Sequence, residues 1–326
     1  MKYVQFGSTG LEISEICLGT MTFGNEADEA VSFSIMDYAA SLGINFFDCA
    51  HNYNKGLTEE IVGRWLKGRR DEFILATKVF FPYGGGRNDQ GLSRRNILAS
   101  LERSLRRLQT DYVDILYLHH WDENCSLESS LAAVNTLVEQ GKVHYLGISN
   151  FSAWQVATAM GITRIKSFAP VSCIQPMYSL VKRQAEVELL PLAEYERLAV
   201  FPYNVIGAGL LTGKYLTGGS GRLKEAEMYR QRYANPQYED VTRRFIAYAS
   251  QKGYSPAALA AAWVKSHPSV SAPIIGARTI EQLQDTLGCL DIVLDPEERA
   301  ALSALSPEPP HATDREPLAA MKSRGW

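Results

Sequence analysis

Reactive side chains follow several short apolar segments of this sequence that have the character of buried β-strands. Asp48, Lys78 and His119 each stand at the end of such a segment, His120 follows directly, and Tyr53 comes five positions after Asp48. A lysine in a buried strand needs an opposite charge, and Asp48 on the adjacent strand is its natural partner. Tyr53 would then lie beside a cation, which we expect to lower its pKa from about 10 by roughly 1 to 3 units.

These residue types suit the reduction of a carbonyl group. A phenol of lowered pKa can deliver a proton, and a neutral histidine can donate a hydrogen bond to a substrate oxygen. No side chain supplies a hydride, so a nicotinamide cofactor is the natural complement. The sequence does not predict a Rossmann dehydrogenase, because Gly84-Gly85-Gly86 opens no expected helix and Gly207-Ala208-Gly209 continues differently from GxGxxG.

A metal-dependent barrel hydrolase is the competing chemistry, and we expect no metal site. Such an enzyme needs a His-x-His pair on a strand, whereas His119 and His120 are adjacent and would point to opposite sides. The cysteines form no CxxC or zinc-finger spacing, which predicts reduced thiols. They are Cys17, Cys49, Cys125, Cys173 and Cys289.

The composition of the 326-residue chain is that of an ordinary globular protein, with 46% hydrophobic and 21% charged residues. Its 33 Lys and Arg against 36 Asp and Glu give a net charge of -3, which excludes a general attraction to nucleic acid or anionic membrane. The first residues lack the apolar core of a signal peptide, and no window approaches the roughly 18 apolar residues of a membrane span. We therefore expect a soluble, cytoplasmic protein.

Eight short apolar segments alternate with helical patterns along the chain. Apolar residues at helical spacing predict helices over 93–108 and 126–140, for example. Eight such units fit a closed α/β barrel, the (β/α)8 TIM barrel, better than an open doubly wound sheet, which usually has about six strands. The expected strands are 16–18, 45–49, 73–79, 113–119, 145–149, 172–177, 199–203 and 272–276.

We expect residues 1–326 to form a single barrel domain in three parts. Segment 1–15 is predicted to be a β-hairpin that plugs the bottom of the barrel, which occupies 16–290. A C-terminal extension, 291–326, holds a helix and a tail that we expect to lie on the barrel surface. The glycine-rich connection 211–238 is long enough to predict a functional or mobile segment.

Ordered motifs at these strand ends make the chain similar to the aldo-keto reductase family. The resemblance runs from the N-terminal hairpin to at least the helix after the eighth strand. The matching segments are Leu18 to Gly24, Phe47 to Ala50 with Tyr53, Ala76 to Lys78, Asp114 with His119, Gly147 to Phe151, Gln175, Gly209 to Lys214 and Ile275 to Arg278.

The resemblance implies an NADP-dependent oxidoreductase that reduces aldehydes or ketones to alcohols, or catalyses the reverse oxidation. Tyr53 would be the general acid, with Asp48 and Lys78 as the pair that tunes it. The family's substrate-orienting histidine lies five residues after the strand-four aspartate, which from Asp114 selects His119.

The resemblance also implies where NADPH or NADP+ binds. Ser149, Asn150 and Gln175 would hold the nicotinamide carboxamide, since an amide needs both donors and acceptors. Tyr203 would stack on the nicotinamide, and Arg278 would bind the adenosine 2'-phosphate, which favours NADPH over NADH. Further cofactor-binding residues would be Asn204, Gly207, Gly209, Leu210, Lys214, Gly276, Gln282 and Asp285.

Two other expectations concern the rim and the role of the protein. Lys214 and the glycines from Gly218 to Gly221 are hypothesised to close over the pyrophosphate as a mobile clasp. Met21, Phe23 and Trp121 are expected to shape the pocket for a small carbonyl substrate. The alternative to catalysis is an NADPH-binding regulatory subunit, similar to the potassium-channel β subunits of the same family.

Overall fold

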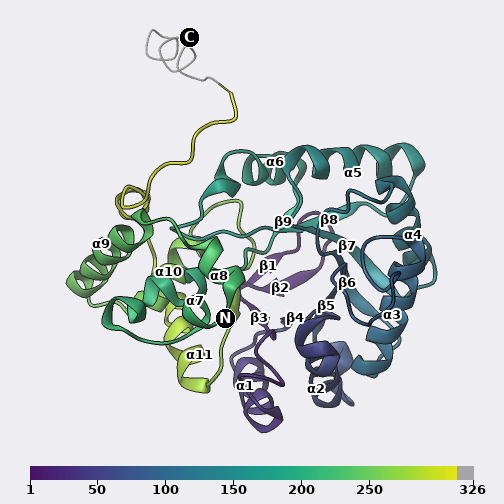
Figure 1. Cartoon of the computed structure of the whole chain (residues 1–326), viewed down its shortest axis with the longest axis horizontal. Helices are drawn as coiled ribbons and strands as arrows, with labels where there is room; N and C mark the ends of the chain where they lie inside the picture. The colour runs from purple at the N-terminus through teal and green to yellow at the C-terminus, as the bar shows by residue number, and fades with distance from the viewer. Residues whose placement is uncertain (314–326) are drawn as a thin grey trace.

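The computed structural model describes residues 1–313 and contains one sheet of eight parallel strands surrounded by helices (Figure 1). Along the sheet the strands are ordered β10-β3-β4-β5-β6-β7-β8-β9. Their bounds are β3 Cys17–Gly19, β4 Phe46–Asp48, β5 Ile74–Val79, β6 Val113–Leu118, β7 Val143–Ser149, β8 Val171–Gln175, β9 Ala199–Val200 and β10 Ile274–Gly276.

Backbone hydrogen bonds between the two ends of this order, the segments of β9 and β10, bring the sheet round on itself. The amide of Ile274 donates to the carbonyl of Pro202 at 2.8 Å, and the amide of Ser271 donates to the carbonyl of Val200 at 3.0 Å. Every neighbouring strand pair is parallel, as strand–helix alternation requires. The predicted (β/α)8 barrel is confirmed.

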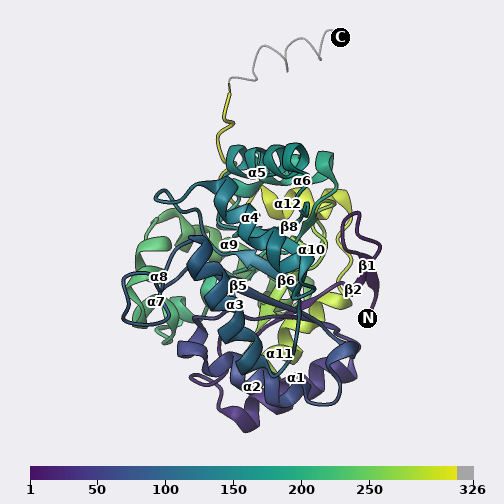
Figure 2. The same ribbon diagram turned by 90° about the vertical axis from the view of Figure 1, so that its right-hand side faces the viewer.

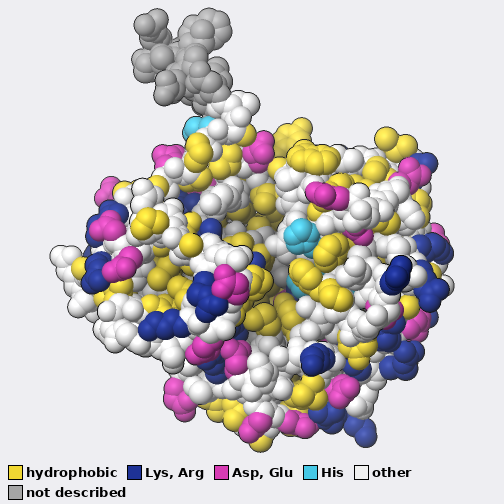
Figure 3. All heavy atoms as spheres, viewed as in Figure 1, with side chains coloured by type: hydrophobic (Ala, Val, Ile, Leu, Met, Phe, Trp, Pro, Cys, Tyr) yellow, Lys and Arg dark blue, Asp and Glu magenta, His cyan; other side chains and the backbone are white. Residues whose placement is uncertain are grey.

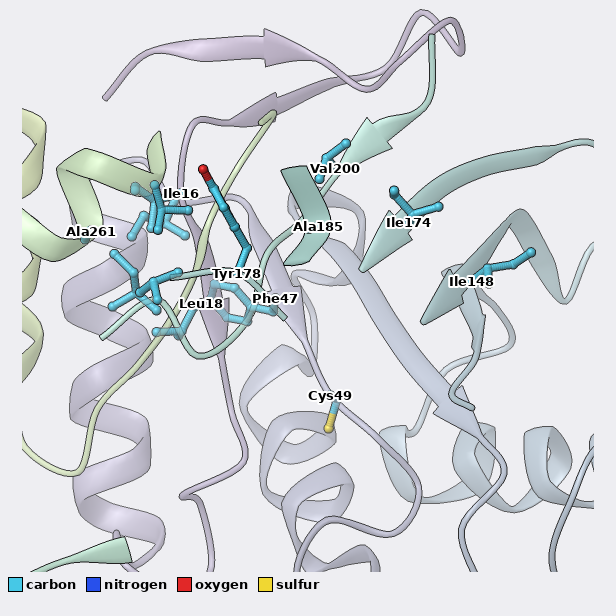
Figure 4. Packing of buried hydrophobic residues seen from close by; sticks show 14 of the residues in the cluster. Ile16, Leu18, Phe47, Cys49, Ile148, Ile174, Tyr178, Ala185, Val200 and Ala261 are labelled. Atoms are coloured by element: carbon cyan, nitrogen blue, oxygen red, sulfur yellow. The ribbon is translucent and has the colours of Figure 1, made fainter. Parts of the chain in front are cut away.

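Alternate strand residues build two apolar layers, because successive side chains point to opposite faces of a strand. Cys17, Phe46 and Phe201 point to the barrel interior and pack in one buried cluster. Leu18 and Phe47 belong to the other cluster, between the strands and the helices (Figure 4). Both layers are needed, since strands of a parallel barrel are buried on both faces.

The predicted N-terminal hairpin, β1 (Tyr3–Gln5) with β2 (Glu12–Ser14), plugs the barrel. Phe6 and Ile13 are fully buried in the interior cluster, where the Phe6 ring lies 5.1 Å from that of Tyr145 and 5.5 Å from that of Phe201. Gly7 has a φ of +54°, and a Cβ there would stand 2.8 Å from the carbonyl oxygen of Arg197. Figure 2 shows the hairpin at the opposite end of the barrel from the helices α7 (Arg222–Glu225) and α8 (Glu227–Arg232).

The helices that connect the strands begin and end where the sequence indicates. The hydroxyl of Ser93 accepts from the Asn96 amide and begins α3, which ends before Gln109 in the left-handed conformation. The other helices are α1 Glu29–Ser41, α2 Leu57–Leu66, α4 Leu127–Glu139, α5 Ala153–Lys166, α6 Leu189–Glu196, α9 Gln237–Lys252, α10 Pro256–Lys265, α11 Ile280–Leu287 and α12 Pro296–Ser303, and α3 spans Arg94–Leu108. Short 3-10 turns are η1 Tyr53–Gly56, η2 Arg70–Glu72, η3 Gln184–Glu186, η4 Gly207–Thr212, η5 Lys214–Thr217 and η6 Gly288–Leu290.

Three segments differ from the sequence-based expectation. Strand β9 ends at Val200 instead of residue 203, although the Tyr203 amide still donates to the Pro176 carbonyl at 3.0 Å and Tyr203 forms an isolated bridge with Met177. The connection 211–238 is not an open loop but contains η5, α7 and α8. Residues 307–313 run away from the barrel instead of along it (Figure 1), and 314–326 lie outside the described residues.

We predict that the hairpin plug contributes strongly to stability. Replacing Phe6 by Ala should lower the free energy of unfolding by about 3 to 5 kcal/mol, since it leaves a cavity in the barrel interior, and Phe6→Leu should cost less. Urea unfolding measures both. Ile165→Ala removes an 83% exposed side chain and serves as the control, with an expected change within about 0.5 kcal/mol. Equal effects of Phe6→Ala and Ile165→Ala would contradict the prediction.

Candidate active site

A cavity of about 810 Å³ opens at the C-terminal end of the barrel, where the strands deliver their last residues. Asp48 from the end of β4, Tyr53 from η1 and His119 after β6 all line it. Figure 3 shows this face hollowed near its centre, with apolar side chains inside the hollow and basic side chains beside it over α7 and α8. The structure therefore brings the sequence-predicted reactive groups together.

The ammonium group of Lys78 organises the floor of this site. Its side chain is fully buried, and Nζ donates to Asp48 Oδ2 at 2.5 Å, to the carbonyl oxygen of Cys49 at 2.7 Å and to the Tyr53 hydroxyl oxygen at 3.1 Å. An ammonium has three hydrogens and no acceptor. All three are used, so the Tyr53 oxygen is an acceptor toward Lys78 and its own hydrogen is available for another partner.

The protonation states follow from burial and from this contact. Burial raises the pKa of Tyr53 to about 12, although the Lys78 charge lowers it. The expected lowering toward neutrality is therefore wrong for this structure, because desolvation of the phenolate outweighs the attraction of the cation. Burial opposes the charge on Lys78 too, but Asp48 and Tyr53 outweigh it and raise the Lys78 pKa.

His119 is held as a neutral imidazole against Tyr53. Its side chain is 8% exposed, and its ring centroid lies 6.3 Å from that of Tyr53, edge to face. Burial lowers the pKa of His119 well below 6.5, and the nearby Lys78 charge lowers it further. His119 Nδ1 is buried without a hydrogen-bond partner in the described part of the chain, whereas the exposed His120 ring pairs with the Trp121 carbonyl oxygen at 2.9 Å.

Polar side chains from β7, β8 and β9 form a second group in the cavity wall. Asn150 Nδ2 donates to the His119 carbonyl oxygen at 2.8 Å and to Ser149 Oγ at 3.0 Å, while Asn150 Oδ1 accepts from the Tyr203 hydroxyl at 2.6 Å. Gln175 Nε2 donates to Asp48 Oδ1 at 2.8 Å. The predicted carboxamide-binding residues are therefore hydrogen-bonded to one another and, through Asp48, to Lys78.

The remaining wall fits a dinucleotide. Asn204 Nδ2 is a buried donor without a partner among residues 1–313, and Asn204 lines the cavity. Gly209 has a φ of +86°, and a Cβ there would stand 2.9 Å from Lys214 Cε. Because only glycine fits this turn without strain, the backbone of η4 can approach a ligand closely. Gly276, Gln282 and Asp285 line the same cavity.

Arg278, the predicted phosphate ligand, is joined to an acidic residue that the sequence analysis did not single out. Arg278 Nη2 lies 2.7 Å from Glu26 Oε1, and Arg222 Nη2 lies 3.0 Å from Glu26 Oε2. One carboxylate therefore connects the loop after β3 to α7 and to the start of α11. Arg278, Arg222 and Lys214 all line the cavity.

Four of the predicted binding residues do not line the cavity. The Phe23 side chain is fully buried in the core, so its expected place in the substrate pocket is wrong, while Met21 does line the cavity. Trp121 packs edge-on against Phe151, with ring centroids 5.3 Å apart. The other two, Gly207 and Leu210, belong to η4 and contribute to its turn instead of the wall.

A buried ion pair behind the site was missed by the sequence analysis. Glu59 is fully buried, accepts from Thr77 Oγ1 at 2.6 Å and lies 3.0 Å from Arg107 Nη1. Arg107 also donates to the His51 carbonyl oxygen at 3.0 Å, and a Cβ on Gly56 would stand 2.1 Å from Arg107 Nη1. Arg107 thereby supports both flanks of the Tyr53 turn.

Asn54 holds the front of the same turn. Its Nδ2 donates to the carbonyl oxygens of Phe23 at 2.7 Å and Met21 at 3.1 Å, and its φ is +46°. An asparagine directly after Tyr53 was the available signal, since asparagine tolerates the left-handed conformation. Glu59 and Arg107 gave no such signal, because each fits the polar face of an ordinary amphipathic helix.

Two further observations concern residues 1–313. No three histidine, cysteine or acidic side chains in this part of the chain stand close enough to hold a metal ion. No helix in it combines the length and apolar character that a membrane crossing requires.

Comparison with known proteins identifies the family. The model of the aldo/keto reductase family matches residues 15–307. The chain belongs to this family. The uncharacterized oxidoreductase YrpG of Bacillus subtilis is 39% identical over 322 residues, which cover 95% of this chain and 97% of the relative.

Two other relatives show how differently members of the family are named. Norsolorinic acid reductase A of Aspergillus parasiticus is 34% identical, over 89% of this chain and 77% of its own length. A probable voltage-gated potassium channel subunit beta of Arabidopsis thaliana is 35% identical, over 90% of this chain and 92% of its own length. Family membership together with relatives such as YrpG supports an oxidoreductase.

We predict that Arg107 stabilises the aldo-keto reductase barrel through Glu59. Arg107→Ala should lower the free energy of unfolding by about 3 to 5 kcal/mol, because it leaves a buried carboxylate without its cation. Arg106→Ala, the neighbouring exposed position, is the matched control and should change stability by no more than about 0.5 kcal/mol. Urea unfolding compares the two. If both variants unfold at the same urea concentration, the ion pair has no such role.

Proposed function

We propose that this protein reduces aldehydes or ketones to alcohols with NADPH, or catalyses the reverse oxidation, and that Tyr53 is the general acid. The observation that carries the proposal is the saturation of Lys78, whose three hydrogens go to Asp48, Cys49 and Tyr53. The phenolic hydrogen of Tyr53 is thereby left for a group in the cavity. A carbonyl oxygen is the acceptor that such a donor suits.

The chain's own groups account for the proton and for the developing charge. A phenol with a pKa of about 12 stays protonated at neutral pH, so the acid form that reduction needs is the resting form. A bound nicotinamide supplies the hydride that the carbonyl carbon accepts. As the carbonyl oxygen takes the Tyr53 proton, the Lys78 ammonium stabilises the phenolate, and neutral His119 donates a hydrogen bond to the same oxygen.

The cofactor would be oriented by the polar wall and held by the cations. Ser149, Asn150 and Gln175 offer donors and acceptors for the carboxamide, and Tyr203 offers an aromatic face to the nicotinamide. The carboxamide would then lie next to Tyr53, because Gln175 bonds the same Asp48 that pairs with Lys78. Lys214 and the segment 218–221 would close over the pyrophosphate as a clasp.

A regulatory subunit with little catalysis is the second candidate. The relative named as a probable potassium channel subunit beta favours it. The complete set of Asp48, Tyr53, Lys78 and His119 supports catalysis instead, since hydrogen bonds join the first three and the Tyr53 and His119 ring centroids lie 6.3 Å apart. Turnover of NADPH with a panel of aromatic and aliphatic aldehydes, ketones and dicarbonyls separates the two, since a purely regulatory subunit binds NADPH without consuming it.

Tyr53→Phe should keep NADPH affinity while lowering kcat by roughly 100-fold or more, because it removes the proton donor and leaves the cavity wall in place. Absorbance of NADPH gives kcat, and fluorescence titration gives the cofactor Kd. Tyr112→Phe is the control, since the Tyr112 hydroxyl bonds Asp71 at the N-terminal end of β6, the end opposite the cavity. Unchanged turnover in Tyr53→Phe would remove Tyr53 as the acid.

Arg278→Gln should raise the Kd for NADPH by roughly tenfold or more and leave the Kd for NADH nearly unchanged. The reason is that a charge-assisted hydrogen bond to the 2'-phosphate contributes about 1.5 to 3 kcal/mol, and NADH lacks this phosphate. Titrating the same variant with NADPH and with NADH controls for a general loss of cofactor binding. Parallel losses for both cofactors would show that Arg278 acts on the fold and not on the 2'-phosphate.

A further inference from the structure

Four cations line the cavity, and three of them gather at one end. They are Lys214, Arg222, Arg278 and Arg232. Arg222 and Arg278 share the Glu26 carboxylate. A Cβ on Gly221, the residue before Arg222, would stand 2.5 Å from Lys214 Nζ, so Lys214 lies beside the same pair. This group of three has the charge that the phosphates of a dinucleotide need.

Arg232, the last residue of α8, belongs to the other end of the cavity. Burial raises the pKa of Tyr203, and the positive charge that opposes this most strongly is that of Arg232, ahead of Lys78. The Tyr203 hydroxyl in turn bonds Asn150, which also bonds the carbonyl of His119. The hydroxyl of Tyr233, the residue after Arg232, lies 4.0 Å from Met177 Sδ, and Met177 forms a β-bridge with Tyr203. Helix α8 therefore ends on the Tyr203 side of the cavity, where Asn150 and His119 also lie.

Arg232 has no carboxylate within salt-bridge distance among residues 1–313, unlike the arginines near it. Arg222 is 3.0 Å from Glu26, and Arg230, two positions earlier on α8, is 2.5 Å from Glu227. The Arg232 guanidinium instead contacts two uncharged groups. Its Nη2 lies 4.0 Å from Met228 Sδ, and its Cζ lies 5.5 Å from the centroid of the Tyr229 ring.

The wall around Arg232 is otherwise mostly apolar. Met177, Val205, Met228 and the buried Tyr229 also line the cavity, and Met228 and Tyr229 contact Arg232. A guanidinium without a carboxylate partner has its hydrogens available to a planar or tetrahedral anion. Arginine is the side chain best suited to binding carboxylate and phosphate through two parallel hydrogen bonds.

We propose that Arg232 selects carbonyl substrates that carry an anionic group, a carboxylate or a phosphate, at the end remote from the carbonyl. The substrate spans the cavity with its carbonyl oxygen at Tyr53 and its anionic group at Arg232. This inference rests on the proposed reductase function, of which it names the substrate class. The cofactor's own phosphates are served by Lys214, Arg222 and Arg278 and do not require Arg232.

The test compares substrates that differ only in charge. The pairs are 4-carboxybenzaldehyde with methyl 4-formylbenzoate, and glyceraldehyde 3-phosphate with glyceraldehyde. The wild-type kcat/KM should favour the charged member of at least one pair by roughly tenfold, and the pair that shows it distinguishes carboxylate from phosphate. This preference should weaken as salt is raised, because salt screens charges in partly exposed sites.

Variants assign the preference to Arg232. Arg232→Gln should lower the charged-to-neutral ratio of kcat/KM by roughly tenfold, mainly through KM, and Arg232→Lys should restore part of it. Arg230→Gln on the same helix is the matched control and should leave the ratio within about twofold of wild type. A wild-type ratio near one, a ratio unchanged in Arg232→Gln, or a rise in the Kd for NADPH as large as the loss in kcat/KM would each overturn the proposal.

A binding measurement separates this proposal from the proposed function. Calorimetric titration of the protein–NADP+ complex with 4-carboxybenzyl alcohol and with its methyl ester needs no turnover. If no carbonyl compound is reduced but the acid binds more tightly than the ester in wild type and not in Arg232→Gln, the reductase function fails and the anion site stands. If aldehydes are reduced but neither pair shows a preference, the reductase function stands and the anion site fails.

Discussion

The site depends on a single buried cation whose hydrogen bonds are all committed. Lys78 Nζ has three hydrogens and three acceptors, from the side chain of Asp48, the backbone of Cys49 and the hydroxyl of Tyr53. A buried ammonium without such partners would lose its proton or be expelled toward water. The positions of β4, β5 and the Tyr53 turn relative to one another are therefore constrained by one charge, and the direction of the Tyr53 hydrogen follows from it.

The surrounding structure maintains this arrangement from two sides. Behind the Tyr53 turn, Arg107 bonds the His51 carbonyl while paired with the buried Glu59, which also accepts from Thr77 next to Lys78. In front, Asn54 fixes the turn to the loop after β3. The barrel interior below is filled by side chains such as Phe6 and Phe201. The plug therefore fills the end of the barrel opposite the candidate site, the end at which barrels of this kind place no chemistry.

Much of the fold and of the reactive group could be predicted from the sequence. Short apolar segments alternating with amphipathic helices specify a parallel barrel, and Asp48, Lys78 and His119 stand at strand ends that must meet at one rim. Strand ends were less predictable, as β9 shows, because its regular part ends at Val200 while the apolar segment continues to Tyr203. The position of Phe23 was predicted wrongly. An aromatic residue near the rim packs either into the core or toward the cavity, and the neighbouring residues do not determine the backbone turn that decides between the two.

Two kinds of property could not be predicted from the sequence: those that depend on how deeply a group is buried, and those that depend on pairs of residues far apart in the chain. The pKa of Tyr53 depends on how much water the finished cavity admits, and burial outweighs the cation beside it. Glu26 with its two arginines, and Glu59 with Arg107, are pairs of residues from separate helices or loops, and each member alone resembles a solvated surface charge. The isolated Arg232 becomes recognisable only once the pairs around it are known.

The hairpin at the closed end of the barrel has a practical consequence for handling the molecule. Met1 is exposed beside β1, and Figure 2 shows that this end lies across the barrel from α7 and α8, which flank the cavity. A chemical tether or fusion partner at the first residue would therefore orient every molecule with its cavity toward the solvent. An electrode or bead coated in this way would present a uniform layer of accessible sites.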